Sequence, residues 1–176
     1  MAESLRQKGQ KAKDRFIKLV TNVRRSNDFS SGDTEVNIDG VWYHVDVKDC
    51  TSNTINQIRA IRYQTLVIYF DGVWYVIPPQ EVVRLVGQRN RGQHTEIPFE
   101  CAALTLNQIE SVYRCSDSQL AERVYAAIRM GQQEQFKEVK NIMDNLYSDL
   151  IKLKERTKST LFPYTTLFRS DRKSVV

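Results

Sequence analysis

The chain has 176 residues, 41% of them hydrophobic, which is enough to bury one core without disulfides or structural metals. Its formal net charge is +5, and it contains no apolar run long enough to span a bilayer, which excludes a membrane-spanning protein. The three cysteines are odd in number and widely spaced, as is typical of reduced thiols, and the basic start leads into an amphipathic pattern rather than an apolar signal peptide. We therefore expect a cytoplasmic protein with one main domain.

The first predicted element is a helix over Lys11–Arg25, where apolar residues recur at helical spacing. A polar break at residues 30–33 follows this pattern. Two alternating runs come next, Glu35–Ile38 and Val41–Lys48, on either side of Asp39-Gly40. Asp-Gly is the pair that a tight primed turn requires, because both central residues need a positive φ, so we expect a β-hairpin here.

The pentapeptide DGVWY occurs twice, in this first hairpin and again from Asp71. The second copy lies between the apolar runs Leu66–Phe70 and Trp74–Ile77, which predicts a second hairpin. Two prolines then follow and should end the last strand, because proline has no N–H group for a ladder. A short helix is expected after them, over Gln80–Val86.

Three further helices are expected. The first lies between the two hairpins, over Asn53–Arg62, and buries three isoleucines: Ile55, Ile58 and Ile61. The next should open at the capping box Ser116-x-x-Gln119 and end at Gly131. The apolar residues of the last helix form a heptad seam: Phe136, Val139, Met143, Leu146, Leu150 and Leu153. The last two helices make up a C-terminal region, residues 116–157, whose seam either packs on the core or mediates self-association.

The final segment, residues 158–176, changes character abruptly from the charged helical pattern before it. Its sequence STLFPYTTLFRSDRKSVV resembles the translated sequencing-adapter read-through that recurs in assembled metagenomic open reading frames. A disordered tail is the alternative, and both interpretations exclude the segment from the fold. Three basic residues against one acidic residue in the quoted stretch, residues 159–176, supply +2 of the net charge of +5, so the remaining chain is only mildly basic.

The strand Val41–Lys48 carries polar side chains in alternation with apolar ones. Since successive side chains point to opposite faces of a strand, Asp46 and Lys48 should lie side by side, and Glu35 or Asp33 can reach the same face from the preceding strand. Metal-dependent phosphodiester hydrolysis uses such a set, because carboxylates hold a divalent cation while an ammonium group lies near the attacking water. A solvated strand face with an ordinary salt bridge is the alternative.

The order of expected elements over Lys8–Ile77 resembles that of the PD-(D/E)XK nuclease superfamily: helix, acid-bearing strand, hairpin, Asp-x-Lys strand, helix and strand. The matching residues are GDTEVNIDGVWYHVDVK, in which Asp46, Val47 and Lys48 correspond to the (D/E)XK half of the motif. The resemblance implies an α/β, restriction-endonuclease-like fold for residues 1–115, with a mixed central β-sheet flanked by helices.

The resemblance also implies roles for individual residues. Asp46 would bind Mg²⁺, for which Mn²⁺ can substitute, and the backbone carbonyl of Val47 would be a further ligand. Lys48 would position or activate the nucleophilic water. The superfamily's Pro-Asp pair is missing, so the first acid is either Glu35 or Asp33. The pattern favours Glu35, because EVNI reproduces an acid followed by alternating apolar residues.

Other candidate residues lie outside the motif. The opening KGQKAKDRF resembles the first helix of archaeal-type Holliday junction resolvases in this superfamily, where an acidic residue assists the metal site, so Asp14 would be its counterpart. Gln57, near the head of the expected helix, either contacts the site or faces solvent. The polar loop Val86–Glu100 either follows a phosphate backbone or is an ordinary surface loop. Its candidate DNA-binding residues are Arg89, Arg91 and His94.

We therefore expect a Mg²⁺-dependent DNA endonuclease of the restriction, homing or resolvase type. A homodimer is expected, because the antiparallel strands of a duplex present equivalent phosphates to two sites related by a two-fold axis. Two alternatives stay open. One is a non-catalytic nucleic-acid-binding module with the same fold, and the other is an interaction protein assembled through its last helix.

Overall fold

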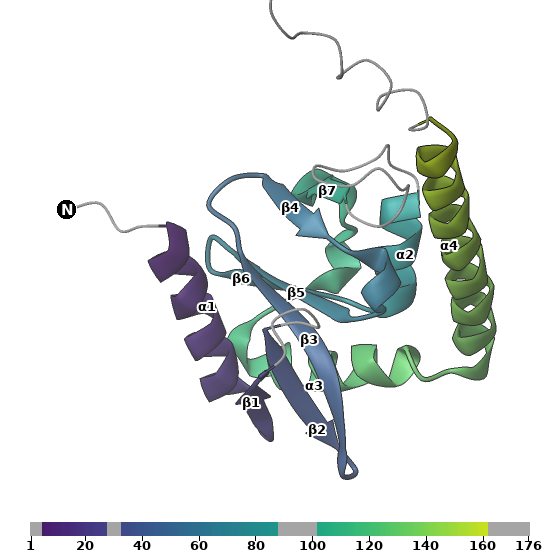
Figure 1. Ribbon diagram of the computed structural model, residues 1–176. Helices are drawn as coiled ribbons and strands as arrows, with labels where there is room; N and C mark the ends of the chain where they lie inside the picture. The colour runs from purple at the N-terminus through teal and green to yellow at the C-terminus, as the bar shows by residue number, and fades with distance from the viewer. Residues whose placement is uncertain (1–4, 28–32, 88–101, 162–176) are drawn as a thin grey trace, which may run out of the picture. The chain divides into compact units, whose positions relative to one another are not determined.

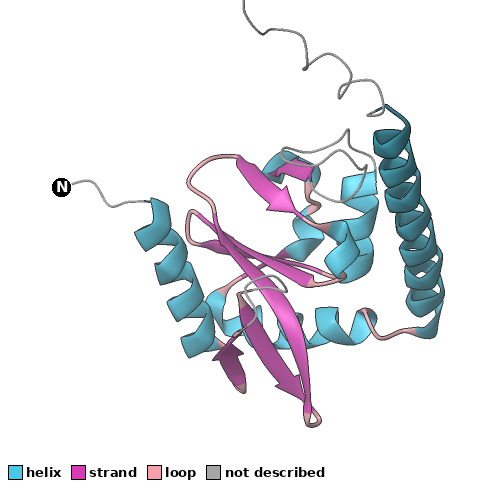
Figure 2. Cartoon of the chain, in the orientation of Figure 1, coloured by secondary structure: helices cyan, strands magenta, loops and turns pink. Residues whose placement is uncertain are grey.

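The computed structural model describes residues 5–27, 33–87 and 102–161. Within them the chain has a mixed α/β fold with a six-stranded sheet, a second sheet of two strands and four α-helices (Figure 1, Figure 2). The helices are α1 (Leu5–Leu19), α2 (Pro79–Gly87), α3 (Asp117–Met130) and α4 (Glu134–Leu161). The strands are β1 (Val23–Arg25), β2 (Thr34–Ile38), β3 (Val41–Asp49), β4 (Thr54–Ile58), β5 (Thr65–Phe70), β6 (Val73–Ile77), β7 (Ala102–Thr105) and β8 (Arg114–Cys115).

The six-stranded sheet has the order β1-β2-β3-β5-β6-β8. Strands β3 and β5 are parallel, and the other neighbouring pairs of this sheet are antiparallel. The sheet therefore consists of two antiparallel halves joined by a parallel pair. Strands β4 and β7 form the separate antiparallel sheet. This topology confirms the predicted mixed sheet.

Both predicted hairpins are present, β2–β3 and β5–β6. Asp39 and Gly40 have φ values of 52° and 85°, and Asp71 and Gly72 have φ values of 48° and 82°. Positive φ at both central residues is the geometry of the primed turn, whose twist matches that of the flanking strands. The two copies of DGVWY thus share one turn conformation, as the sequence predicts.

The large sheet buries a core on each face. On one face α1 and α3 pack against β3, β5 and β6, and this cluster includes Phe16, Val45, Val47, Trp74 and Leu120. On the other face α2, β4 and β7 cover the sheet, and this cluster includes Leu66, Ile68, Ile77, Leu85 and Leu104. Because side chains alternate along β3, Asp46 and Lys48 project to the second face while Val45 and Val47 enter the first core.

The first helix differs from its prediction at both ends. Helix α1 begins at Leu5 and ends at Leu19, and Val23–Arg25 forms an edge strand paired with β2. Asn22 separates the two elements with a φ of 54°, a left-handed conformation that asparagine tolerates better than most residues. The predicted continuation of the helix to Arg25 is therefore wrong. The position of Val23 fits helical spacing, but it packs against the core from a strand.

The prediction of a helix over Asn53–Arg62 is also wrong. The segment forms strand β4 and a single 3₁₀ turn over Ala60–Arg62. Ile55 pairs with Leu104 and Ile58 with Ala102, so β4 has one more residue than β7 between these pairs, and the register is irregular there. Such a bulge turns two residues that are three apart toward the same side, which explains why Ile55 and Ile58 are both buried as a helix would have them.

The predictions for α2 and α3 are confirmed. Strand β6 ends at Ile77, and α2 opens at Pro79. At the start of α3 the backbone N–H of Ser116 donates to Gln119 Oε1 at 3.1 Å, as in the predicted capping box. Helix α3 contributes four residues to the first core: Leu120, Val124, Ala127 and Ile128. It therefore belongs with the sheet.

The chain divides into two compact units between Val139 and Lys140. The boundary predicted between residues 115 and 116 does not coincide with this division, because α3 is part of the first core. Helix α4 continues to Leu161, which is beyond the predicted start of the tail at residue 158, since the first helix-breaking residue is Pro163. Residues 162–176 lie outside the described residues. No helix in the described ranges is long and apolar enough to cross a membrane.

Candidate active site on strand β3

The Asp46–Lys48 pair lies on the β3 face that points toward α2, β4 and β7. Lys48 Nζ is 3.1 Å from Asp46 Oδ2, and the exposed fractions of the two side chains are 26% and 17%. The predicted side-by-side placement of these groups is therefore confirmed. The pair is half-buried, unlike a fully solvated surface pair, so its charges are less screened by water.

The neighbours of this pair differ on its two sides. Toward β5, Asp46 is in register with Leu66 and Lys48 with Ile68, and both of these apolar residues are buried. Toward β2, the ladder ends where Thr34 pairs with Val45. In the described part of the chain, residues 46–49 therefore have no strand beside them on the β2 side.

Glu35, the acid favoured by the sequence pattern, is engaged elsewhere. It lies across from His44 in the β2–β3 ladder. Arg24 Nε donates to Glu35 Oε2 at 2.6 Å, and Glu35 Oε1 is 3.6 Å from His44 Nδ1. The sequence could not indicate the Arg24 contact, because the pattern predicts a helix where β1 occurs.

Asp33 directly precedes β2, and the register extended by one residue beyond Thr34–Val45 places it across from Asp46. The backbone N–H of Ser26 donates to the Asp33 carbonyl at 3.2 Å, which continues the β1–β2 pairing to this residue. Its carboxylate binds Lys13 Nζ at 2.8 Å. Asp33 is therefore nearer to Asp46 along the strand direction than Glu35 is, but both carboxylates are engaged, that of Asp33 by Lys13 of α1 and that of Glu35 by Arg24 of β1.

Among the described residues, no contact joins the candidates Asp14 and Gln57 to this pair. Asp14 accepts a hydrogen bond from Gln10 Nε2 at 3.1 Å and pairs with Arg25, on a helix that packs against the opposite face of the sheet. Gln57 is an exposed residue of β4 with a φ of 60°, not the head of a helix. The three loop candidates lie outside the described residues: Arg89, Arg91 and His94.

The described residues contain no group of three or more His, Cys, Asp or Glu side chains that could together hold a metal ion. A Mg²⁺ site does not need such a group, because Mg²⁺ is usually bound by one or two carboxylates, with water and substrate phosphate as the remaining ligands. Asp46 and Asp33 are hard oxygen donors, as is the carbonyl of Val47.

Two cysteines of the described chain are buried and have no nucleophilic role. Burial raises the pKa of Cys50, which follows β3, to about 11. Burial also raises the pKa of Cys115 above its ordinary value. Because the thiolate is the reactive form, both residues stay protonated and unreactive near neutral pH.

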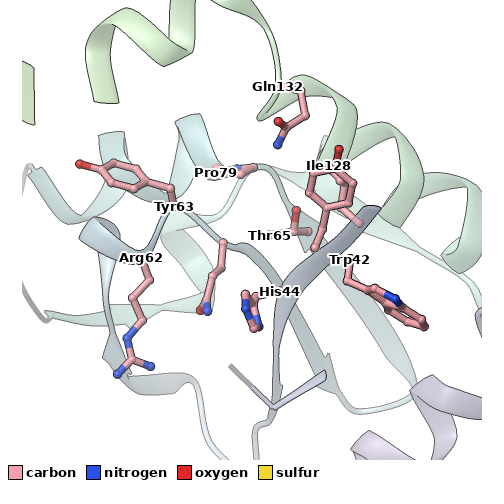
Figure 3. Close-up of a pocket in the computed structure, with 10 residues that line it drawn as sticks. Trp42, His44, Arg62, Tyr63, Thr65, Pro79, Ile128 and Gln132 are labelled. Carbon is pink, nitrogen blue, oxygen red and sulfur yellow. The ribbon is translucent and has the colours of Figure 1, made fainter. Parts of the chain in front are cut away.

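A cavity that the sequence does not predict lies at the other half of β3. Its volume is about 160 Å³. Figure 3 shows His44 and Thr65 in the middle of its lining, Tyr63 and Trp42 on opposite sides, and Gln132 and Pro79 above. Four separate stretches of the chain contribute to it, so no local sequence pattern marks it.

No model of a known protein family and no curated protein matches this chain. A proposal for the function must therefore be argued from the geometry around β3.

Proposed function

We propose that the chain is a Mg²⁺-dependent DNA endonuclease with a restriction-endonuclease-like fold. The observation that supports this function is the half-buried Asp46–Lys48 pair, with its two groups 3.1 Å apart on a central strand, just beyond the end of the described β2–β3 ladder. Asp33 directly precedes the antiparallel neighbour β2. An acid, a lysine and a second acid from the adjacent strand make up the set that the superfamily resemblance requires.

The residues of this set have distinct tasks. Asp46, Asp33 and the carbonyl of Val47 would hold the metal ion, which polarises the phosphate and lowers the pKa of a bound water. Lys48 carries a positive charge that stabilises the negative charge developing on the phosphate and orients the attacking water. The buried neighbours Leu66 and Ile68 keep water away from one side of the pair, which strengthens both electrostatic effects.

Cleavage and metal binding test the proposal together. The purified chain is incubated with supercoiled, linear and branched DNA in Mg²⁺ or in EDTA, and Mn²⁺ binding is measured separately by titration. We expect Mg²⁺-dependent cleavage by the wild type, and weakened Mn²⁺ binding in Asp46→Asn. Asp149→Asn is the matched control, because it removes an acid of an exposed ion pair on α4. Wild-type protein that cleaves none of these DNAs with any divalent metal would contradict the proposal.

The choice between the two first acids has its own test. Asp33→Asn should reduce cleavage strongly, because Asp33 is the acid next in register to Asp46. Glu35→Gln should have the smaller effect, since that carboxylate binds Arg24. The reverse order of the two variants would return the role to Glu35.

The two alternative functions predict other outcomes of the same experiment. A non-catalytic nucleic-acid-binding module would bind DNA at low salt and bind the metal without cleaving. An interaction protein assembled through its last helix would show no affinity for DNA at low salt. Either result would favour that alternative over the proposed endonuclease function.

We expect the endonuclease to act as a homodimer, because two antiparallel DNA strands suit two symmetric sites. Helix α4 exposes large apolar side chains of the seam, including Val139, Leu146 and Leu153. The first seam residue, Phe136, is instead buried within the first unit, where its ring lies 6.0 Å from that of Tyr63. The seam available for pairing therefore starts after Phe136.

Sedimentation tests the dimer. The double variant Met143→Glu and Leu146→Glu should be a folded monomer if these residues pair between chains, because charge would be buried at the contact. Unfolding or aggregation would instead indicate packing within one chain. A wild-type monomer at micromolar concentration that still cuts both strands would exclude the symmetric dimer.

A further inference from the structure

The two strands that form the parallel pair are staggered. Strand β5 begins at Thr65, across from Val45, so residues 41–44 of β3 extend beyond the end of β5. The chain before β5 turns away at Tyr63, whose φ of 51° is left-handed and therefore strained for a tyrosine. The stagger leaves a space beside the projecting end of β3. The ends of α2 and α3 close this space, and it is the cavity of Figure 3.

The size of the cavity limits what it can hold. A volume of about 160 Å³ is close to the roughly 150 Å³ that holds a benzene ring in other proteins. It is well below the roughly 300–1,000 Å³ of pockets for drug-sized ligands. The cavity is partly open to solvent, and it can enclose one six-membered ring, but it cannot fully enclose a nucleotide cofactor or the two fused rings of a purine.

The lining combines aromatic rings with groups that donate and accept hydrogen bonds. The aromatic residues are Trp42, Tyr43 and Tyr63. The polar ones are His44, Arg62, Gln64, Thr65 and Gln132. Such a lining matches the way proteins hold an unstacked base, by stacking on its face and hydrogen bonds to its edge.

Two polar side chains of the lining support a polar ligand rather than an apolar one. Gln64 is only 9% exposed, although it lines the cavity. The Nδ1 atom of His44 is buried without a hydrogen-bond partner in the described structure, and its nearest acid, Glu35, is 3.6 Å away. The cavity wall at this end of β3 is therefore polar as well as aromatic.

The cavity is close to the proposed site. His44 and Asp46 are two residues apart on β3 and point to the same face, so they are about 7 Å apart along the strand. A nucleotide whose phosphate lies at Asp46 can therefore place its own base, or that of its neighbour, at His44.

We propose that this cavity binds one unpaired pyrimidine base of the DNA strand whose phosphate lies at Asp46 and Lys48. This inference rests on the proposed function, and it adds a substrate class: DNA with an unpaired pyrimidine next to the scissile bond. An intact duplex must first break a base pair and a stack to fill the cavity, whereas a bulged nucleotide is already free to enter.

Binding to bulged duplexes in EDTA tests the cavity without requiring cleavage. Three short duplexes are compared that differ only in the bulged position, which is a thymidine, an adenosine or an abasic sugar. For the wild type we expect about tenfold tighter binding of the thymidine bulge than of the abasic bulge, as stacking and edge contacts to one base would give. The adenosine bulge should bind no more tightly than the abasic one.

Variants connect this preference to the cavity. Gln64→Leu keeps the size of a buried side chain but removes its hydrogen-bonding groups, so it should bind the three duplexes alike. Gln132→Leu is a second variant in case Gln64→Leu does not fold, because Gln132 is exposed at the rim. Gln133→Leu is the matched control, since Gln133 is also exposed but does not line the cavity, and it should keep the wild-type preference.

The outcomes separate this inference from the endonuclease itself. Equal affinity of the wild type for the three duplexes, or a thymidine preference that survives in both cavity variants, would overturn the cavity assignment even if Mg²⁺-dependent cleavage occurs. A thymidine preference lost in Gln64→Leu, with no cleavage in any metal, would support the cavity and overturn the endonuclease. Absence of any DNA binding would overturn both.

Discussion

The two DGVWY hairpins have the same sequence at the turn and the same turn conformation, but the strands that follow have different surroundings. Trp74, in the second copy, is 0% exposed, while Trp42, in the first, is 38% exposed. The indole N–H of Trp74 donates to Asp117 Oδ1 at 2.7 Å, and the ring of Trp42 lies under the guanidinium of Arg24, 3.9 Å from its centroid. The same pentapeptide therefore places its tryptophan in the core in one copy and at the surface in the other.

The position in the sheet explains this difference. Strand β6 lies between β5 and β8, and helices or the small sheet cover both of its faces. The turn end of β3 projects beyond β5 and pairs only with β2. Turn conformation is therefore a local property of Asp-Gly, whereas burial is set by the stagger of neighbouring strands. The projecting copy is free to carry polar and charged groups, and it leads to Asp46 and Lys48.

The largest effect is expected at the equivalent positions that follow the two turns, Lys48 and Gln80. Lys48→Ala should reduce Mg²⁺-dependent DNA cleavage by about 10²- to 10⁴-fold, because a group that stabilises developing charge is lost. Gln80→Ala removes a hydrogen bond to the Met130 carbonyl and should leave the cleavage rate close to that of the wild type. Initial rates on one DNA substrate measure both. Wild-type cleavage by Lys48→Ala would show that the first copy has no more catalytic role than the second.

The tryptophans should differ in their contribution to stability. Trp74→Ala should lower the free energy of unfolding by about 3–5 kcal/mol, because it leaves a cavity in a packed core. Trp42→Ala should lower it by about 0.5–1 kcal/mol, which is typical of an exposed cation–π contact. Urea denaturation of both variants gives the comparison. Equal losses would mean that Trp42 is as well packed as Trp74.

The turn glycines should behave alike, in contrast to the tryptophans. An added Cβ meets nothing within 4 Å at Gly40 or Gly72, so the strain of the left-handed φ is the main cost of either alanine substitution. Each variant should lose about 1–2 kcal/mol of stability. Thermal unfolding under identical conditions tests whether the two losses are equal. A clearly larger loss at one glycine would contradict a shared turn conformation.

The smallest effect is a pH dependence that involves only the second copy. Hydrogen bonds from Arg15 and Trp74 lower the pKa of Asp117 below its ordinary value of 3.8. Because the folded pKa is the lower one, the carboxylate contributes stability above pH 3.8, and this contribution is lost as the pH falls through the folded value.

Asp117→Asn should therefore flatten the acid side of the stability curve by about 0.2–1 kcal/mol, the range of an exposed ion pair. Urea midpoints between neutral pH and the acid limit measure this change for the wild type and the variant. Trp42→Phe serves as a comparison from the first copy, and it should leave the shape of the curve unchanged. If the urea midpoint falls equally steeply with acid pH in the wild type and in Asp117→Asn, Asp117 does not contribute to the pH dependence of stability.

The sequence predicts those parts of the fold whose cause is local. The Asp-Gly turns, the capping box at Ser116 and the prolines after β6 act through a few adjacent residues, and each is where the pattern places it. The sequence-based prediction fails where contacts between distant parts of the chain determine the secondary structure. Val23 fits helical spacing but lies in an edge strand. Ile55 and Ile58 also fit helical spacing, but they lie on either side of a β-bulge.

The candidate site shows the same division. Alternation along β3 predicts that Asp46 and Lys48 are neighbours, and they are. The pattern cannot choose between Asp33 and Glu35, because the choice depends on the register of β2 and on Arg24 in a strand that the sequence does not reveal. The cavity at His44 is invisible to the sequence, since the stagger of β3 and β5 creates it.

The parallel contact between β3 and β5 has a consequence for the order of folding. Each hairpin closes through a tight turn, and hairpins of this kind form in about 1–10 μs. The β3–β5 pair must instead wait for the closure of the intervening segment, residues 50–64, which is slower for parallel strands. Asp46 and Lys48 acquire their apolar neighbours only at that step. A growing chain therefore has no complete Asp46–Lys48 site until its second hairpin has been synthesised and has docked on the first.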